Sequence, residues 1–213
     1  MNTNPLDKSL AQILNLKYLP WIGDNFSDTG LLIVGDSHYD DGDGWLEGNK
    51  LATRQMILNN GVHDRFPARF LNAIELLFCN RTLEQNDRAK FWQKLGYMNL
   101  VQRLMASSAE RPSDKDFDQG WEVCLDIINI IRPKYCVKLG IDGIGRLGTT
   151  MKEKGWTGIA EEFRIRPSKG DPYRITISRG DYTTTMLFVH HPTGTRGFDQ
   201  PYWTSIIDPP PDM

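Results

Sequence analysis

The chain has 213 residues, of which 39% are hydrophobic and 24% charged, and its formal net charge is −2 at pH 7. These values are typical of a globular protein, so we expect a single domain over residues 1–213 with a frayed tail from about residue 208. The charge excludes a chain that binds nucleic acid through bulk positive charge, so such binding needs a local basic face. The lack of a ~20-residue apolar run and of a signal-peptide pattern predicts a cytoplasmic protein that does not bind membranes.

The three cysteines, Cys79, Cys124 and Cys136, have apolar neighbours and no Cys-x-x-Cys spacing. We interpret them as buried free thiols in a reducing compartment, which argues against an iron–sulfur or zinc site. The aspartate-rich segment Asp40–Gly48 lacks the closing glutamate and the flanking helices of an EF-hand. We therefore expect no metal and no cofactor.

In chain order, Pro5–Leu19 has apolar residues at helical spacing, which predicts a helix. The apolar run Leu31–Val34 is typical of a strand buried on both faces. It ends at Gly35 and is followed by Asp36, Ser37, His38 and Tyr39. Because open α/β sheets bind ligands at the carboxyl ends of their strands, these residues are the first candidate site. Trp45, in the loop that follows, could stack on a ligand or close the core.

The middle of the chain predicts helices over Asn49–Asn60 and Phe66–Phe78, then a short strand over Tyr97–Val101. Asn99 is the strongly polar side chain of this strand, and a buried asparagine needs hydrogen-bond partners. It could tie down a loop backbone or bind a ligand.

Ser113–Asp116 fits a capping box that opens a helix ended by Pro133, and Tyr135–Gly140 reads as the next strand. Gly143–Gly148 matches the dinucleotide-binding glycine pattern, but no βαβ unit with a following acidic residue surrounds it. We interpret it as a turn into a helix.

Strands are predicted over Glu162–Arg166 and Tyr173–Ser178, and a last buried strand over Thr185–Val189 empties into His190 and His191. The basic residues around the first two form either a phosphate-facing surface or a solvated hairpin. They are Arg164, Arg166, Lys169, Arg174 and Arg179. Buried strands that alternate with helices predict a three-layer α/β/α fold with a central, mostly parallel, four-stranded sheet.

From about residue 30 to 205, the order and spacing of these motifs resemble the uracil-DNA glycosylase superfamily. The matching segments are Val34–Tyr39 (VGDSHY), Tyr97–Leu100 (YMNL), Ile131–Tyr135 (IRPKY), His191–Thr193 (HPT) and Arg196–Phe198 (RGF). In the best-known branch the catalytic aspartate stands two positions after the glycine, where this chain has Ser37. Asp36 matches the position of the acid in the iron–sulfur branch, although that branch's cysteines are absent.

The resemblance implies a monomeric DNA glycosylase that binds DNA with a modified or damaged base and cuts the N-glycosidic bond of the flipped base. The base could be uracil, a deaminated purine or a phage-modified base such as glucosylated cytosine, so the role could be DNA repair or phage defence. The implied catalytic residues are Asp36 and His191. The implied base pocket consists of Gly35, Ser37, His38, Tyr39, Trp45 and Asn99. The implied DNA contacts are Thr193, Thr195 and Arg196.

Two other functions stay open. Gly35–His38 also looks like the opening block of GDSL serine esterases, with Ser37 as nucleophile and His190 or His191 as base. That family expects an aspartate three residues before its histidine, whereas this chain has Leu187 and Phe188 at those positions. The chain could also be a glycosylase-like module that binds nucleic acid without turnover.

Overall fold

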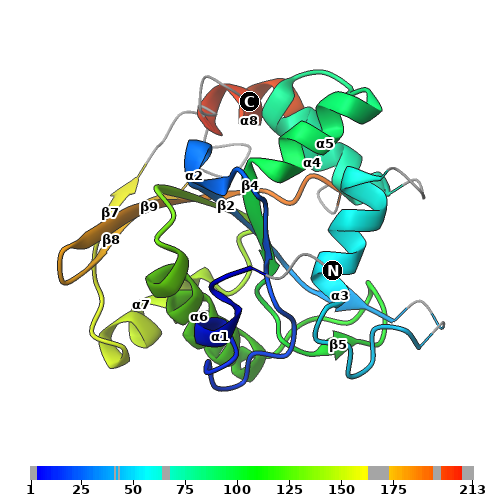
Figure 1. Cartoon of the computed structure of the whole chain (residues 1–213). Helices are drawn as coiled ribbons and strands as arrows, with labels where there is room; N and C mark the ends of the chain where they lie inside the picture. The colour runs from blue at the N-terminus through cyan, green and yellow to red at the C-terminus, as the bar shows by residue number, and fades with distance from the viewer. Residues whose placement is uncertain are drawn as a thin grey trace.

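The computed structural model describes residues 4–40, 42, 44–63, 68–162, 173–193 and 198–207. They form a mixed α/β structure around one seven-stranded sheet, with the strand order β1-β4-β2-β6-β9-β8-β7 (Figure 1). The strands are β1 (Trp21–Ile22), β2 (Leu31–Gly35), β4 (Leu95–Asn99), β6 (Tyr135–Leu139), β7 (Thr157–Glu162), β8 (Tyr173–Arg179) and β9 (Tyr182–Val189). A separate parallel pair joins β3 (His38–Tyr39) to β5 (Leu104–Met105).

The four strands expected from the apolar runs form the parallel centre of this sheet, in the order β4-β2-β6-β9. The expected strand count of four was wrong for the whole sheet, because antiparallel strands extend it on both sides. β1 pairs with β4 at one edge, while β8 and β7 follow β9 at the other. Two paired residues in β1 are too few to produce a detectable alternation.

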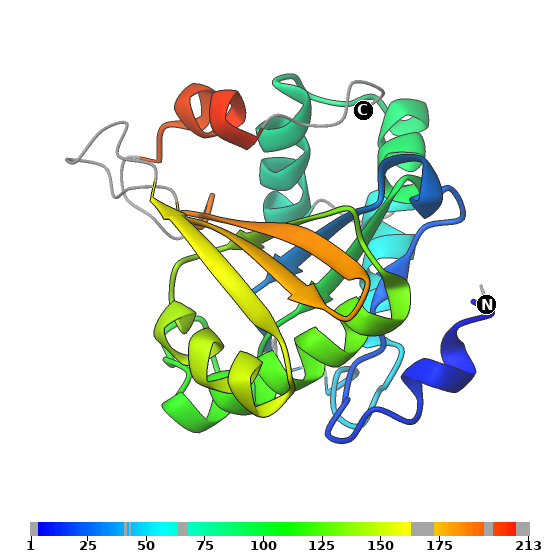
Figure 2. The same cartoon turned by 90° about the vertical axis from the view of Figure 1, so that its left-hand side faces the viewer.

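Helices cover both faces of the sheet, as the two views show (Figures 1 and 2). The helices are α1 (Asp7–Leu10), α2 (Phe26–Thr29), α3 (Ala52–Met56), α4 (Arg69–Cys79), α5 (Gln85–Gln93), α6 (Asp114–Ile131), α7 (Ile144–Glu153) and α8 (Gln200–Ile207), with a π-helix, η1 (Ile57–Val62). Among the described helices, none combines the length and the apolar character needed to cross a bilayer.

Alternation along the buried strands divides the core in two. Leu32 and Val34 of β2 pack in the cluster formed with α6 and α7. Leu31 and Ile33 pack in the cluster formed with α4, α5 and α8. The sheet is therefore filled on both sides, which holds the carboxyl ends of its central strands in fixed positions.

Predictions that rest on a few neighbouring residues, such as a helix cap or a turn, are confirmed. Ser113 and Asp116 form the expected capping box at the start of α6. Gly143, with a φ of +77°, is the N-cap of α7, so the glycine-rich segment is a turn into a helix, as expected. The three cysteines are free, and Cys124 and Cys136 are buried as expected, whereas Cys79 is only partly buried because it is the last residue of α4.

The predicted helix over Pro5–Leu19 was wrong in length, because only α1 is helical there. The helix already ends at Leu10, and Asn15, with a φ of +66°, has a left-handed conformation that is incompatible with a helix continuing to Leu19. Of the predicted strand over Glu162–Arg166, residues 163–166 lie outside the described part, and β7 ends at Glu162. The expected frayed tail from residue 208 also lies outside it.

The strand order has a functional consequence. From β2 the chain continues to β4 on one side of the sheet, whereas from β6 it continues to β7 on the other side and returns through β8 to β9. Parallel sheets bind ligands at such a switch point, in the crevice beyond the carboxyl ends of the two strands. In this protein that crevice lies between the residues that follow Gly35 and Leu139.

Candidate functional site

A cavity of about 890 Å³ opens at the carboxyl edge of the parallel strands, and its wall includes residues that follow β2, β6 and β9. The sequence-predicted residues in its wall are Asp36, Ser37, His38, Tyr39, Trp45, Asn99, His190, His191 and Thr193. Gly35 lies directly behind the wall as the last residue of β2. Thr195 and Arg196 lie outside the described residues. The structure thus brings residues from distant parts of the chain to one cavity.

Asp36 is fixed by a buried lysine that the sequence analysis missed. Lys138, with no exposed side-chain surface, donates from Nζ to Asp36 Oδ1 and to the carbonyl oxygen of Leu139. Gly140 stands behind the carboxylate, where an added Cβ would lie 3.0 Å from both of its oxygens. Because Oδ1 is occupied by the ammonium group, Oδ2 is the oxygen left for a ligand. A charged residue inside a buried parallel strand is the sequence signal that could have identified Lys138.

His191 faces Asp36 across the cavity wall, with 4.0 Å between its Nε2 and Asp36 Oδ2. The backbone N–H of Thr193 donates to His191 Nδ1 at 3.3 Å. Since a backbone N–H can only donate, Nδ1 accepts, and the proton of the neutral ring lies on Nε2. Phe70 stacks on the imidazole with 5.3 Å between ring centroids and an interplanar angle of 8°.

The electrostatic surroundings keep His191 neutral. Burial lowers the pKa of His191 below its usual value, and the charge of Lys138 lowers it further. The carboxylates of Asp36 and Asp142 act in the opposite direction but do not outweigh burial. At neutral pH the ring therefore presents a single N–H donor, Nε2–H, next to Asp36.

Asn99 ends β4 with its side chain in the cavity wall and 4% of its surface exposed. The hydroxyl of Tyr97, two residues earlier on the same strand face, donates to Asn99 Oδ1 at 2.7 Å. Gln102 donates to the Asn99 carbonyl oxygen at 2.8 Å. Asn99 is therefore fixed at both backbone and side chain, and its side-chain oxygen is held by Tyr97 rather than by a loop backbone.

His38 has a structural role in this arrangement. Its Nε2 lies 2.8 Å from Thr53 Oγ1, and its ring meets Tyr18 edge-on. Burial lowers the pKa of His38 to about 4, so the ring is neutral under ordinary conditions. It supports the cavity wall from behind, since its side chain is almost fully covered.

Ser37 does not form the hydrogen bond that a serine nucleophile requires. Its Oγ is buried and has no hydrogen-bond partner within the described part of the chain. His190 Nε2 is likewise buried without a partner there, and its ring packs against Trp203 with centroids 5.3 Å apart. Neither imidazole is thus positioned to take a proton from Ser37 in this structure.

The mouth of the cavity is aromatic and basic. Tyr39 and Trp45 keep 39% and 40% of their surfaces exposed, so Trp45 does not close the core as one interpretation of the sequence had it. Arg69, the first residue of α4, and Arg111 also line the cavity, and both are exposed. The sequence analysis identified neither arginine, because no local pattern connects a helix start or a loop residue to a distant sheet edge.

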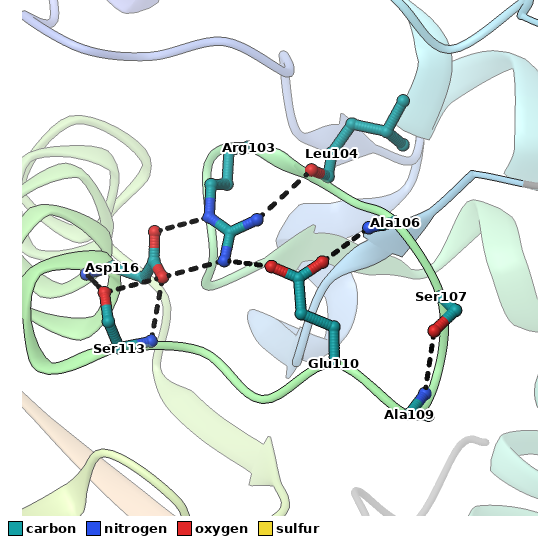
Figure 3. Close-up of polar contacts among 8 residues, drawn as sticks. All are labelled: Arg103, Leu104, Ala106, Ser107, Ala109, Glu110, Ser113 and Asp116. Carbon is teal, nitrogen blue, oxygen red and sulfur yellow. Dashed lines mark hydrogen bonds and ion pairs between the residues drawn. The ribbon is translucent and has the colours of Figure 1, made fainter.

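Arg111 and Ser108 come from the loop between β5 and α6, which an ionic cluster fixes in place (Figure 3). The Arg103 guanidinium donates to both oxygens of Asp116, at 2.8 and 3.1 Å, and pairs with Glu110 at 2.7 Å. Glu110 in turn accepts from the backbone N–H of Ala106 at 2.6 Å. The loop is therefore tied to α6 at both of its ends.

Part of the predicted basic surface can be located. Arg174 and Arg179 lie on β8, whereas Arg164, Arg166 and Lys169 lie outside the described residues. Neither Arg174 nor Arg179 lines the cavity.

No protein-family model matches the chain, and no curated protein matches its sequence.

Proposed function

We propose that the chain is a DNA glycosylase that hydrolyses the N-glycosidic bond of a flipped-out base and leaves an abasic site. One observation carries the proposal: a carboxylate, a neutral imidazole and a buried amide, from strand ends far apart in sequence, line a single cavity. Uracil, a damaged base and a phage-modified base are the candidate substrates, in DNA repair or in phage defence.

The chemistry of this bond explains the residue types. Its cleavage develops positive charge on the sugar and negative charge on the departing base. The Asp36 carboxylate suits the sugar side, and the His191 Nε2–H suits the base side as a hydrogen-bond donor to the developing anion. A preorganised donor of this kind is worth on the order of 10²–10³ in rate.

The distance between the two groups suits a hydrolytic step. At 4.0 Å, Asp36 Oδ2 and His191 Nε2 are too far apart for a direct hydrogen bond. The His191 N–H is therefore free to donate to the base, while Asp36 Oδ2 can accept from a water molecule. In the proposed reaction the water oxygen oriented by Asp36 Oδ2 bonds to the sugar carbon as the carbon–nitrogen bond to the base breaks. The water proton passes to Asp36 or solvent, and the base leaves as an anion that accepts from His191 and is then protonated by solvent.

The cavity wall fits a flat, polar ligand. Exposed rings of Tyr39 and Trp45 at the mouth can stack on a base, and Phe70 backs the imidazole. Arg69 and Arg111 can contact the phosphates on either side of the flipped nucleotide. Flipping costs a few kcal/mol, and least at a mispaired or unpaired base.

The test is incubation of the protein with oligonucleotides and phage DNAs that carry different modified bases, with abasic sites detected by alkaline cleavage. On the best substrate, single-turnover rates and DNA affinities are then measured for Asp36→Asn and His191→Ala. We expect both to retain DNA binding, and His191→Ala to slow excision by about 10²-fold or more.

Matched controls are Asp126→Asn, at a different aspartate–lysine pair on α6, and His63→Ala, at an exposed histidine outside the cavity. Excision at wild-type rates by both cavity variants would remove Asp36 and His191 from the mechanism. Lost affinity with unchanged chemistry would make the cavity a binding site without a catalytic role for them.

A further inference from the structure

A second cavity, of about 280 Å³, lies at the free edge of β1, and we call it the edge cavity. Its wall comes from residues 4, 5 and 7, from β1 and the residue that follows it closely, and from the helix formed by α3 and η1. Arg54 and Leu58 of that helix line the edge cavity, whereas Met56 and Asn60 line the first cavity. The two cavities therefore lie on different faces of one helix, and the edge cavity is a separate site.

The register of β1 determines which backbone groups point toward this edge. The Gly23 N–H donates to the Leu95 carbonyl oxygen at 3.0 Å. Trp21 is paired with Tyr97 in the same ladder. Hydrogen-bonded pairs alternate along an antiparallel ladder, so the N–H and C=O of Ile22, which lies between these two pairs, point away from β4. Neither group has a hydrogen-bond partner among the residues that the structure describes.

The outward groups on either side of Ile22 are already bonded. Arg54 Nε donates to the Pro20 carbonyl oxygen at 2.8 Å. The Asp24 N–H donates to Gln93 Oε1 at 2.9 Å. Since Arg54 and Asp24 also line the edge cavity, the stretch of edge between them opens into it. Ile22 thus offers one donor and one acceptor side by side, while the side chains on either side prevent a whole strand from pairing.

The burial of this backbone pair favours a bound partner. Ile22 keeps 8% of its surface exposed and lines the edge cavity. A backbone N–H or C=O that is covered from bulk water and lacks a partner destabilises a fold, and such groups are rare in native structures. A ligand that supplies one acceptor and one donor at the correct spacing would satisfy both groups.

The rest of the wall limits the kind of ligand. Trp21 and Leu58 contribute apolar surface. The charged residues of the wall are Asp7, Asp24 and Arg54, two carboxylates and one guanidinium, which gives a formal charge of −1 and disfavours an anion. Small-molecule pockets span about 300–1,000 Å³, so a cavity at the lower end of this range suits a compact ligand of about one or two rings.

We propose that the edge cavity binds a small, uncharged and mainly apolar lactam, whose N–H donates to the Ile22 carbonyl oxygen and whose carbonyl oxygen accepts from the Ile22 N–H. In a lactam ring the N–H and C=O lie side by side and point the same way, as they do on one residue of an extended strand. The site is independent of the proposed glycosylase function, because the two cavities share no lining residue among those that the structure describes.

The test titrates 2-quinolone, a flat uncharged lactam, into the full chain and follows binding by calorimetry and by proton–nitrogen NMR. We expect a dissociation constant of about 1 mM or lower and a shift of the Ile22 amide resonance, because its N–H gains an acceptor. N-methyl-2-quinolone lacks the N–H and is expected to bind about tenfold more weakly. The anion 2-naphthoate has a similar size and is expected to bind no more tightly than the N-methyl compound.

Leu58→Trp is the site variant, because the larger side chain occupies the edge cavity, and it is expected to weaken binding of 2-quinolone by about tenfold or more. Leu14→Trp is the control, at a leucine that is 79% exposed and lines neither cavity, and it is expected to bind as wild type does. Thermal unfolding establishes that both variants are folded. If Leu58→Trp does not fold, the resonance shifts of wild type decide, since they identify the residues that the ligand contacts.

Shifts centred on Ile22 and the edge cavity, together with the dependence on the ligand N–H, would support the proposal. The proposal is overturned by the lack of any shift at about 2 mM 2-quinolone, by equal affinity for the N-methyl compound, or by shifts centred on Asp36 and Asn99 instead. Tighter binding of a capped pentapeptide of alternating threonine and valine would also overturn it, because the edge would then accept a strand. Base excision is measured separately and is unaffected by any of these outcomes.

Discussion

Lys138 and Asp36 depend on each other because the lysine has no exposed side-chain surface. Taking an ammonium group out of water costs several kcal/mol, which a carboxylate and hydrogen-bonded carbonyl oxygens can offset. The ion pair therefore fixes the orientation of the Asp36 carboxylate: the ammonium group binds one of its oxygens and leaves the other to bind a ligand. Removing either partner leaves an uncompensated charge next to the cavity.

This coupling predicts a non-additive pair of substitutions. Asp36→Asn should destabilise the protein by on the order of 3 kcal/mol, because it leaves the Lys138 ammonium buried without a counter-charge. The double variant Asp36→Asn with Lys138→Met should recover part of that stability, since no buried charge remains. Urea denaturation of both single variants and the double variant measures the coupling. Additive losses would show that the two charges do not stabilise each other.

His38 predicts how stability depends on pH. Its pKa is lowered from 6.5 to about 4 in the folded protein, so the unfolded chain takes up the proton first as the pH falls. Stability is therefore expected to decrease between pH 6.5 and about 4, and the contribution of this ring is constant above that window. Thermal unfolding of wild type and His38→Gln between pH 4 and 8 tests this. A wild-type curve as steep as that of the variant would contradict it.

At the level of helices and strands, the sequence predicts those elements that a short local pattern of residues determines. Buried parallel strands such as Leu31–Gly35 are visible as apolar runs, and the capping box of α6 is visible from two residues. The length of the N-terminal helix was not predictable, because the apolar spacing continues to Tyr18 although α1 ends at Leu10. Strand β1 was missed since its pairing partner is distant in sequence.

The loop between β5 and α6 gives a prediction of its own. Arg103→Ala should weaken DNA binding, because the loop that carries Arg111 to the cavity loses its connection to Asp116 and Glu110. Stability should change little, by about 1 kcal/mol or less per ion pair, since Arg103 is partly exposed. Arg132→Ala, at a surface pair with Asp181, is the control. DNA affinity is measured by fluorescence anisotropy. If it falls for Arg111→Ala but not for Arg103→Ala, the ionic cluster does not position the loop.

At the scale of the molecule, the sequence predicts the polar residues that directly follow buried strands and misses those brought in by packing. Asp36, Asn99 and His191 reach the cavity because parallel strands end at one edge. Phe70 and Asn60 reach it from helices whose orientation depends on the whole core. Nothing local distinguishes Tyr97 from a strand residue that only packs, whereas the charge of Lys138 within an apolar strand was a signal that the sequence analysis did not use.

The order of strands in the sheet also predicts which strand unfolds locally most readily. The central strands β2 and β6 have partners on both sides, whereas β7 is the outermost strand of the described sheet, with Ile159 73% exposed. Amides of β2 and β6 should exchange with solvent only on global unfolding, while those of β7 should exchange through local opening. Hydrogen exchange followed by mass spectrometry tests this, and equal protection of β7 and β2 would contradict it.

The position of β9 in the sheet has a consequence for synthesis of the protein. β9 is the last strand in the chain but inserts between β6 and β8. During translation at about 5–20 residues per second, Asp36 therefore emerges roughly 8–30 s before His191. Until β9 joins, the parallel strands present an unpaired edge at β6, and the carboxylate of Asp36 has no imidazole opposite it. If the protein excises bases as proposed, a chain that still lacks β9 is expected to be inactive, because His191 follows that strand.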